Sequence, residues 1–223
     1  TNSLIAFSEQ QKPKIISALI PSVVSYANAE IIVGKAAQQL DNISSAKSLM
    51  GKAPADLNAE QKAIFNLHKN SSEQIIELDV AGQKTNAIQI SAEILKYLKL
   101  LAEEKLNQQV NKAVITVPAY FDEAARKATK DAAQLAGLEV LRLINEPTAA
   151  ALAYGLDQQA EGLHIVYDLG GGTFDISVLK MRKGVFQVLA SGGDRNLGGD
   201  NFDSILAKYL QQKYQIAEFS KPL

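Results

Sequence analysis

The sequence predicts an α/β fold, because strand patterns and helix patterns alternate along its second half. From residue 113 onward the expected order is β-α-β-α-β-β-β-α, which argues for a mixed sheet flanked by helices. Of the 223 residues, 47% are hydrophobic and 21% are charged, as is usual for globular domains. This length is enough for one large domain or two modest ones.

The first half of the chain predicts shorter elements. A β-branched run at 15–26 is interrupted by Pro21, which implies a sheet edge or a bend. The other elements expected here are a strand at 3–8, a strand ending at Gly34, a helical segment at 36–40, a short helix or turn at 42–50 capped by Gly51, a loop at 52–58, and a hairpin of 75–80 and 87–90 around the turn 81–83.

Two amphipathic or alanine-rich helices follow. Ser91 is expected to cap the first, since apolar residues recur on one helical face at Ile94, Leu98, Leu101 and Leu106. After a strand at 113–117 that stops at Pro118, Asp122 can cap a helix that runs to Leu135 and ends at Gly137. The remaining expected elements are a strand at 140–144, a helix from Glu146 to Gly155 with Pro147 in its first turn, a linker at 157–162, a strand at 184–190 and a helix at 201–214.

Between the linker and the last strand, the stretch Ile165–Lys180 predicts a hairpin whose turn suits phosphate. It reads as a strand at 165–168, a turn at 170–173 and a second strand at 174–181. Its three consecutive glycines have no Cβ, so a ligand can approach the backbone of the turn closely. Successive inward-pointing N–H groups in such a turn form a concave anion site, and Thr173 adds a hydroxyl donor.

Asp168 and Asp175 place a carboxylate on either side of this turn. A carboxylate would repel a phosphate unless a divalent cation lay between them, and Mg²⁺ is commonly held through a few carboxylates, phosphate oxygens and water. These residues alone leave two interpretations open. One is a metal-nucleotide phosphate loop, and the other is an ordinary tight hairpin with solvated acids.

Composition excludes several classes of function. The chain has no cysteine, which rules out disulfides, thiolate metal sites and cysteine nucleophiles. Its two histidines, His68 and His164, lie far apart in the sequence, which argues against a His-based metal site or catalytic triad. A net charge of −1 and a pI of about 6.1 give no electrostatic reason to expect nucleic acid or an anionic membrane as partner. No apolar run is long enough to span a bilayer.

Several stretches, in this order along the chain, are similar to one family. They are Thr1–Leu4, Ser45–Gly51, Val114–Phe121, Ile144–Gly155, Asp168–Ile176 and Leu197–Asp203. Together they resemble the nucleotide-binding domain of the DnaK-type, seventy-kilodalton heat-shock chaperones, over essentially all 223 residues. Residues 42–52, 184–190 and 192–194 resemble the branch of this family that is devoted to iron–sulfur cluster assembly.

The resemblance implies an actin-like ATPase fold, related to ribonuclease H, with two lobes around a nucleotide cleft. Residues 1–160 would form a nearly complete lobe I, with a smaller subdomain at about 15–90, and residues 161–223 a truncated lobe II with the Gly-rich hairpin. The start of the first phosphate turn would precede Thr1, while the adenine pocket and the peptide-binding domain would follow Leu223. This piece is therefore expected to bind ATP poorly, and micromolar or tighter affinity by calorimetry would contradict that expectation.

The resemblance also implies ATP or ADP and Mg²⁺ as cofactors and assigns residues to the site. Lys47 matches the catalytic lysine that orients the attacking water and contacts the γ-phosphate. Glu146 and Asp168 match carboxylates that position water and hold Mg²⁺, the latter mostly through water molecules. Asp175 lies beside them. The matching phosphate-turn residues are Gly170, Gly171, Gly172 and Thr173, the last of which also belongs to the catalytic set, while Thr1 and Asn2 remain from the first turn.

The resemblance also assigns residues that pass the nucleotide state to the rest of the chaperone and residues that contact a partner protein. Pro118 and Arg126 match a proline–arginine relay, and Arg142 and Asn145 match positions that contact a J-domain cochaperone. Taken by themselves, Pro118 merely ends a strand and Arg126 is an exposed helix charge. The resemblance further implies a client protein, possibly an iron–sulfur scaffold, bound through a peptide-binding domain, and a bacterial cytoplasmic location. A targeting signal cannot be assessed from a sequence that opens without Met.

The function predicted from these observations is the ATP-binding and ATPase domain of a chaperone that couples hydrolysis to client binding. A metabolite kinase of the same superfamily, acting on a sugar or a carboxylate, stays open as an alternative, although no further candidate base for an acceptor pocket is found. An actin-like filament protein also stays open, and ATP-dependent sedimentation would distinguish it. Two positions depart from the family pattern, since Ser48 stands where Arg is usual and Asn201 where many relatives carry an acid.

Overall fold

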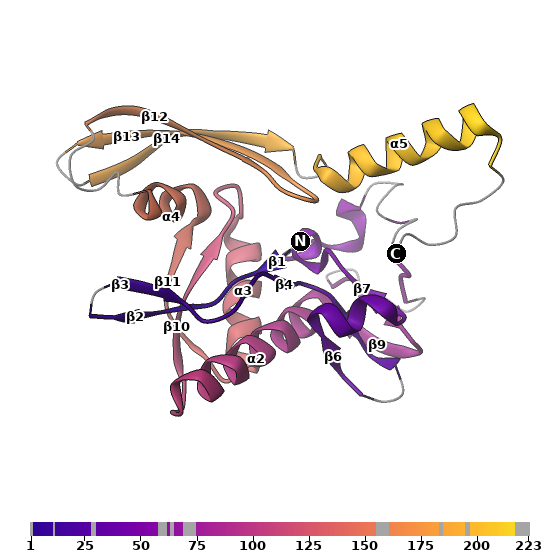
Figure 1. The fold of residues 1–223 in the computed structure, drawn as a ribbon, viewed down its shortest axis with the longest axis horizontal. Coiled ribbons are helices and arrows are strands. Elements are labelled where there is room, and N and C mark those ends of the chain that lie inside the picture. Colours follow the sequence, from indigo (N-terminus) through magenta and orange to yellow (C-terminus); the bar gives the residue numbers. More distant parts are fainter. Residues whose placement is uncertain are drawn as a thin grey trace. The chain divides into compact units, whose positions relative to one another are not determined.

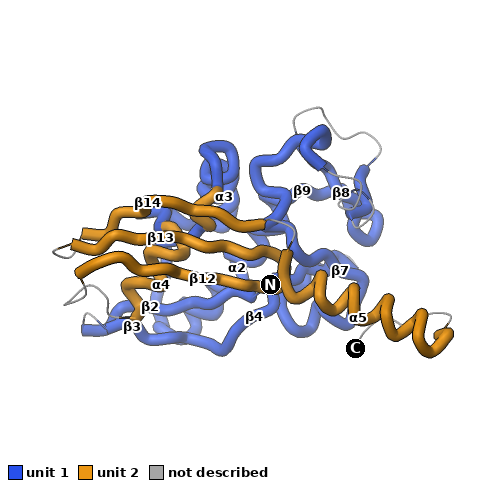
Figure 2. The backbone as a smooth tube through the Cα atoms, turned by 90° about the horizontal axis from the view of Figure 1, so that it is seen from above, with its two compact units in different colours: residues 1–117, 121–144 blue, residues 118–120, 145–223 orange. Residues whose placement is uncertain are grey.

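A computed structural model describes residues 2–10, 12–27, 30–57, 62, 65–68, 75–154, 161–182, 185–194 and 197–216 (Figure 1). It contains both helices and strands, which confirms the α/β class. Contacts divide the chain into two compact units (Figure 2). Unit 1 comprises residues 1–117 and 121–144, and unit 2 comprises residues 118–120 and 145–223. Thr1, Gly155 and most of the expected linker at 157–162 lie outside the described residues.

Unit 1 begins with short strands that pair into small antiparallel sheets. β1 (Asn2–Ser3) pairs with β4 (Ile20–Pro21), and β2 (Ala6–Glu9) pairs with β3 (Lys12–Ile15). The prediction of one strand at 3–8 is wrong, because the chain changes pairing partner between β1 and β2. The other short elements are β5 (Val24–Ser25), which lies between β6 (Ile32–Val33) and β7 (Asn42–Ile43), and the 3₁₀ helices η2 (Gly34–Gln39), η3 (Ala46–Leu49) and η4 (Pro54–Asp56).

Helix α2 (Ala87–Leu106) begins earlier than predicted. Its N-cap is Asn86, whose Oδ1 accepts a hydrogen bond from the Gln89 N–H at 3.0 Å, so the assignment of Ser91 as the cap is wrong. The hairpin before it consists of β8 (Glu77–Val80) and β9 (Gln83–Asn86). The expected strand at 87–90 is instead the first turn of α2, because its buried Ala87 and Ile90 have a spacing that places them on one helical face.

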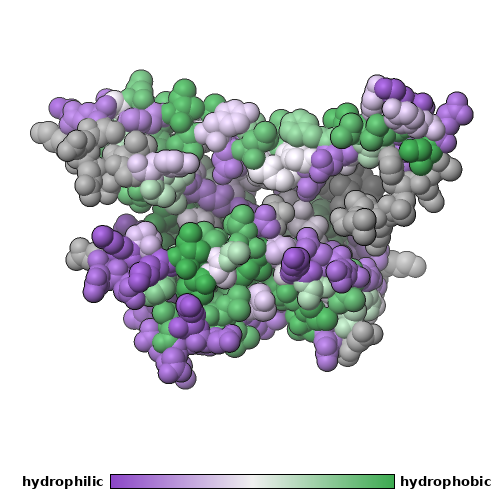
Figure 3. Space-filling view, in the orientation of Figure 1, coloured by the Kyte–Doolittle hydropathy of each residue, from purple (hydrophilic) through white to green (hydrophobic). Residues whose placement is uncertain are grey.

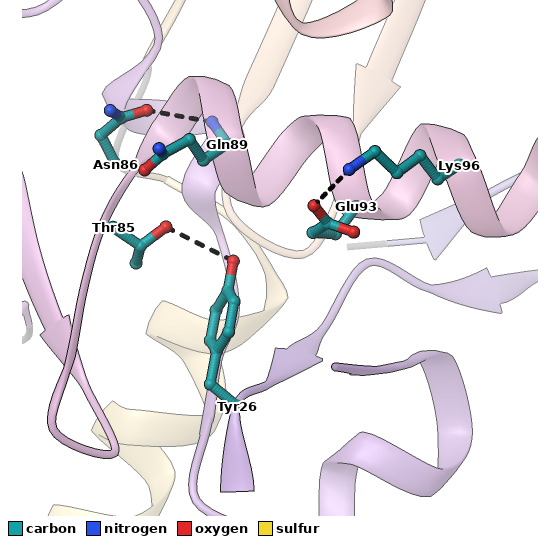
Figure 4. A network of polar contacts seen from close by, with 6 residues as sticks. All are labelled: Tyr26, Thr85, Asn86, Gln89, Glu93 and Lys96. Atoms are coloured by element: carbon teal, nitrogen blue, oxygen red, sulfur yellow. Dashed lines mark hydrogen bonds and ion pairs between the residues drawn. The ribbon is translucent and has the colours of Figure 1, made fainter. Parts of the chain in front are cut away.

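A buried tyrosine connects the small strands of unit 1 to the hairpin that precedes α2 (Figure 4). The Tyr26 side chain is only 6% exposed, and its hydroxyl lies 3.4 Å from the Thr85 Oγ1. Burial raises the pKa of Tyr26 above its ordinary value of 10.0, the Thr85 hydrogen bond lowers it, and the negative charge of Glu93 raises it. The neutral phenol is therefore the form that the folded chain stabilises.

The variant Tyr26→Phe is expected to remove a loss of stability at alkaline pH. Because the folded-state pKa is above the unfolded one, this group contributes stability that is fully present below pH 10 and lost as the pH rises through the folded pKa. At neutral pH the variant should be less stable by about 1 kcal/mol, since Thr85 loses its partner. Unfolding midpoints measured from about pH 8 to 11 test this, and an equal alkaline loss in both proteins would contradict it.

A β-α-β segment completes unit 1 much as the sequence predicts. Helix α3 (Glu123–Leu135) is capped by Asp122, whose Oδ1 accepts from the Ala125 N–H at 2.9 Å. It connects β10 (Lys112–Val117) to β11 (Glu139–Asn145). The Glu139 N–H donates to the Asn111 carbonyl at 2.8 Å, so both strands start at the same end and run parallel. Their shared core contains Ala133, Ala136, Leu138, Leu95, Val110, Ala113, Ile115 and Val140.

The described residues of unit 2 form two helices and an antiparallel sheet. These elements are α4 (Glu146–Ala153), β12 (Gly162–Leu169), β13 (Phe174–Arg182), β14 (Val185–Asp194) and α5 (Gly199–Tyr214). The strands lie in the order β12-β13-β14, and α4 packs against β12 and β13. One face of β13 buries Ser177, Leu179 and Met181.

The opposite face of this sheet is apolar and exposed. Leu163 and Ile165 on β12 are both 68% exposed, and hydrophobic residues are visible along the strands of unit 2 in Figure 3. In the described part of the chain the strands form separate sheets of two or three strands, so the prediction of one mixed sheet is wrong. Alternation along the sequence identifies strands but not their partners. No described helix is both long enough and apolar enough to cross a membrane.

Candidate functional site

The predicted hairpin is the centre of the candidate site, and the structure confirms its form. β12 and β13 pair antiparallel from Gly162 opposite Met181 to Leu169 opposite Phe174. The residues between them close a tight turn, in which the Gly170 N–H donates to the Thr173 carbonyl at 2.9 Å. A Cβ at Gly172 would meet no atom within 4 Å, so the outer side of the turn is open to a ligand.

Asp168 and Asp175 lie directly opposite each other at the base of this turn. Residues paired in this way point to the same face of a sheet, and like charges in such a pair destabilise it. Asp168 is exposed and Asp175 is half-buried. Two neighbouring carboxylates next to a backbone turn therefore suit a cation that offsets their repulsion.

The donor set of this pair fits Mg²⁺ in the presence of a phosphate. Among the described residues no group of three or more His, Cys, Asp or Glu side chains could hold a metal ion by itself. Mg²⁺ usually keeps several waters and takes one or two carboxylates together with phosphate oxygens. Asp168 and Asp175 could supply the carboxylates, and a bound phosphate would supply the other oxygens.

Glu146 belongs to the same unit, at the first position of α4. Asn145 is the N-cap of this helix and has an extended backbone, while buried Pro147 occupies the first turn. An acidic residue is favoured here by the helix dipole, which is sufficient reason for Glu146 to occur at this place. The half-buried Glu146 stays a candidate for the metal site because α4 packs against β12 and β13.

Lys47 lies in unit 1, on the 3₁₀ helix η3. Its neighbours Ala46 and Leu49 are 4% and 2% exposed, whereas Lys47 itself is exposed. Ser45, before this helix, adopts a left-handed conformation with φ 59, and its carbonyl accepts from both the N–H of Ser48 at 2.9 Å and the Oγ of Ser48 at 2.8 Å. The helix is thus fixed by buried neighbours and local hydrogen bonds, with the lysine on its outer side.

Gly51 anchors the other end of this segment. It has φ +72, as expected for the predicted cap, and a Cβ there would lie 2.4 Å from the backbone N of Ala125. Ala125 is in the first turn of α3 and is held by Asp122. The segment that contains Lys47 therefore packs directly on the beginning of α3.

The other predicted residues are placed as follows. Asn2 is exposed on β1, Arg142 is exposed on β11, and Pro118 is fully buried at the end of β10. Arg126 on α3 donates from its Nε to the Phe121 carbonyl at 2.9 Å. The hairpin acids, the glycine turn, Glu146, Asn145 and Pro118 belong to unit 2, whereas Asn2, Lys47, Arg126 and Arg142 belong to unit 1.

One part of the site was missed by sequence reasoning. The segment 197–201, at the start of α5, contacts the glycine turn through its backbone. The consecutive glycines Gly198 and Gly199 could have indicated a close backbone approach. The pattern did not reveal what they approach.

Comparison with known proteins decides the family. The protein-family model described as "Hsp70 protein" matches residues 1–220 of this chain. The chain belongs to the Hsp70 family. This confirms the resemblance found in the motifs and supports the actin-like ATPase fold of that family, while the assignment of lobes stays a prediction.

Curated relatives within the Hsp70 family are HscA chaperones. The chain is 50% identical over 224 residues to the chaperone protein HscA homolog of Vibrio vulnificus (strain YJ016), which covers 96% of this chain and 36% of that protein. It is 48% identical over 231 residues to the chaperone protein HscA of Salmonella newport (strain SL254), which covers 99% and 38% respectively. The chain therefore spans little more than a third of the length of these Hsp70 relatives.

Proposed function

We propose that the β12–β13 hairpin binds Mg-ATP within the complete polypeptide that carries this sequence, as part of the nucleotide-binding domain of a chaperone ATPase. The observation that carries the proposal is the cross-strand pair of Asp168 and Asp175 beside an open glycine turn. An acidic pair alone would not attract a phosphate. Together with Mg²⁺, the same pair and the turn amides form a site for a polyphosphate.

Each residue of the hairpin has a proposed role in binding. The amides of Gly171 and Gly172 donate to phosphate oxygens, and the Thr173 hydroxyl adds a further donor. Gly170, whose N–H closes the turn on the Thr173 carbonyl, lets the phosphate approach the backbone closely. Asp168 and Asp175, with Glu146, position Mg²⁺ mostly through water. When bound, Mg²⁺ neutralises charge on the phosphates.

Lys47 is proposed to act on the reacting phosphate. Lys47 is exposed, a lysine ammonium is a compact positive charge, and the helix of Lys47 is held in place by buried Ala46 and Leu49. We propose that Lys47 orients the attacking water and contacts the γ-phosphate. Since phosphoryl transfer depends on positioning and charge neutralisation, one such group can affect the rate strongly.

The wider role is proposed from the Hsp70 relatives. ATP hydrolysis would change the affinity for a client protein, with Pro118 and Arg126 coupling the two events and a J-domain cochaperone binding at Arg142 and Asn145. Similarity to HscA chaperones supports a role in iron–sulfur cluster assembly. The lobe boundary near residue 160 belongs to the same proposal.

Single-turnover ATP hydrolysis by the complete polypeptide that carries this sequence tests the proposal. Slow turnover that a J-domain protein accelerates is the expected result. Fast turnover that requires a sugar or carboxylate acceptor and ignores the J-domain protein would instead favour a metabolite kinase.

A further inference from the structure

The start of helix α5 lies against the glycine turn of the candidate site, and both belong to unit 2. The Gly199 N–H donates to the Gly170 carbonyl at 3.0 Å, and the Asp200 N–H donates to the Gly171 carbonyl at 2.8 Å. The first amides of a helix have no partner within the helix, so they are available for such bonds. Two consecutive carbonyls of the turn are thus held from one side.

This contact fixes the direction of the amides of the turn. In a trans peptide the C=O and the following N–H point in opposite directions, and no described peptide bond is cis. Because the carbonyls of Gly170 and Gly171 point toward α5, the N–H groups of Gly171 and Gly172 point away from it. These two amides are the ones that the proposed function gives to a phosphate.

Gly198 makes this close approach possible. A Cβ at Gly198 would lie 2.3 Å from the Gly171 carbonyl O and 2.5 Å from the Gly172 N. Its φ is −169, an extended conformation that any residue can adopt. The requirement for glycine at this position therefore comes from the contact with the turn and not from backbone conformation.

Asn201 holds Gly198 in place. The Gly198 N–H donates to the Asn201 Oδ1 at 2.9 Å, and the Asn201 N–H donates to the Gly198 carbonyl at 3.0 Å. The first of these bonds is the half of a capping box in which the N3 side chain accepts from the N-cap N–H, and the second is a backbone bond, so together they fix the first turn of the helix. An aspartate would retain the acceptor, whereas an alanine would lose it.

We propose that Gly198 and Asn201 are positioning residues for the phosphate turn. By fixing two carbonyls of the turn against α5, they hold the amides of Gly171 and Gly172 in the direction that a phosphate needs. Neither residue has to touch the ligand. The identity of the ligand as a phosphate rests on the proposed function, whereas the contact between α5 and the turn is observed independently of it.

The test uses the complete polypeptide that carries this sequence, with Mg-ATP as the probe. Gly198→Ala should weaken Mg-ATP binding at least about tenfold, since the added methyl group displaces the turn. Gly192→Ala is the matched control, because its Cβ would lie 3.8 Å from the nearest atom, the Ile176 Cγ2. This control should bind within about twofold of the unmodified protein.

If Gly198→Ala does not fold, a second pair of variants tests the positioning role. Asn201→Ala should weaken binding about threefold, and Asn201→Asp should restore it, because only aspartate retains the acceptor for the Gly198 N–H. Unchanged affinity in either Gly198→Ala or Asn201→Ala, with the fold intact, would overturn the proposal. A purely structural role would lower the unfolding midpoint of Asn201→Ala and leave its affinity for Mg-ATP unchanged.

Hydrogen exchange gives a readout that does not depend on nucleotide. The amides of Gly199 and Asp200 should be protected in the unmodified protein, lose protection in Asn201→Ala and regain it in Asn201→Asp. Exchange of these amides at the same rate in all three proteins, whether fast or slow, would overturn the positioning role. Absence of Mg-ATP binding in the unmodified protein would contradict the proposed function alone, and exchange would still test the contact.

Discussion

Replacing Lys47 with alanine is expected to lower the single-turnover rate of ATP hydrolysis by about a hundredfold or more. The reason is that the variant removes a positive charge proposed to act on the γ-phosphate and the attacking water. Affinity for Mg-ATP should change by no more than about threefold, because the hairpin of unit 2 supplies the proposed contacts to the other phosphates. Quench-flow measurement of hydrolysis together with calorimetric binding separates the two effects.

Lys35→Ala is a suitable control for the Lys47 variant. Lys35 is also exposed and also lies on a 3₁₀ helix of unit 1, so it matches the loss of charge without the proposed role. Its hydrolysis rate should stay close to that of the unmodified protein. If Lys47→Ala and Lys35→Ala hydrolyse ATP equally well, Lys47 does not have the role proposed for it.

The second large effect is expected at Gly51, where alanine should destabilise the protein by about 3 kcal/mol. Two costs combine at this position. The backbone has φ +72, which alanine tolerates poorly, and a Cβ would collide with the Ala125 backbone N at 2.4 Å. The start of α3 is fixed by the Asp122 cap, and the segment of Lys47 is fixed by its buried Ala46 and Leu49, so the collision cannot be relieved cheaply.

Gly82→Ala separates these two costs. Gly82 has a similar φ of +77 in the turn between β8 and β9, but a Cβ there would meet no atom within 4 Å. This variant should lose only about 1 kcal/mol. Denaturant unfolding of both variants provides the measurement, and equal losses would show that the contact between Gly51 and α3 adds nothing to the backbone cost.

The elements with strong local signals could be predicted from the sequence. The hairpin around Gly170–Thr173 was predicted correctly because a glycine run separates two apolar strands. Helix α3 was predicted correctly because Asp122 and Gly137 mark its two ends. In these cases the neighbouring residues contain the information that determines the structure.

Features that depend on contacts between distant residues could not be predicted in this way. Asn86 caps α2, but the pattern at 87–90 suits a strand or a helix, and only the packing of Ala87 and Ile90 decides between them. The left-handed Ser45 has no local signal, since serine rarely adopts that conformation. The contact of Gly198 with the glycine turn joins residues far apart in the sequence. Two consecutive glycines could indicate a close backbone approach, but not which segment they approach.

The central claim is that the pair of Asp168 and Asp175 binds the phosphates of ATP through Mg²⁺. It is tested most directly by measuring the affinity for ATP with Mg²⁺ and with EDTA, in the complete polypeptide that carries this sequence. The unmodified protein should bind at least about tenfold more tightly with Mg²⁺. In Asp168→Asn this ratio should fall to about twofold, because a carboxylate that attracts Mg²⁺, and repels free ATP, is gone.

Glu161→Gln is the control for this measurement, since Glu161 is an exposed acid of the same unit, next to the start of β12. It removes the same charge and should retain the full effect of Mg²⁺. An ATP affinity that Mg²⁺ does not change in the unmodified protein would contradict the central claim. An effect of Mg²⁺ that is as large in Asp168→Asn as in Glu161→Gln would contradict it equally.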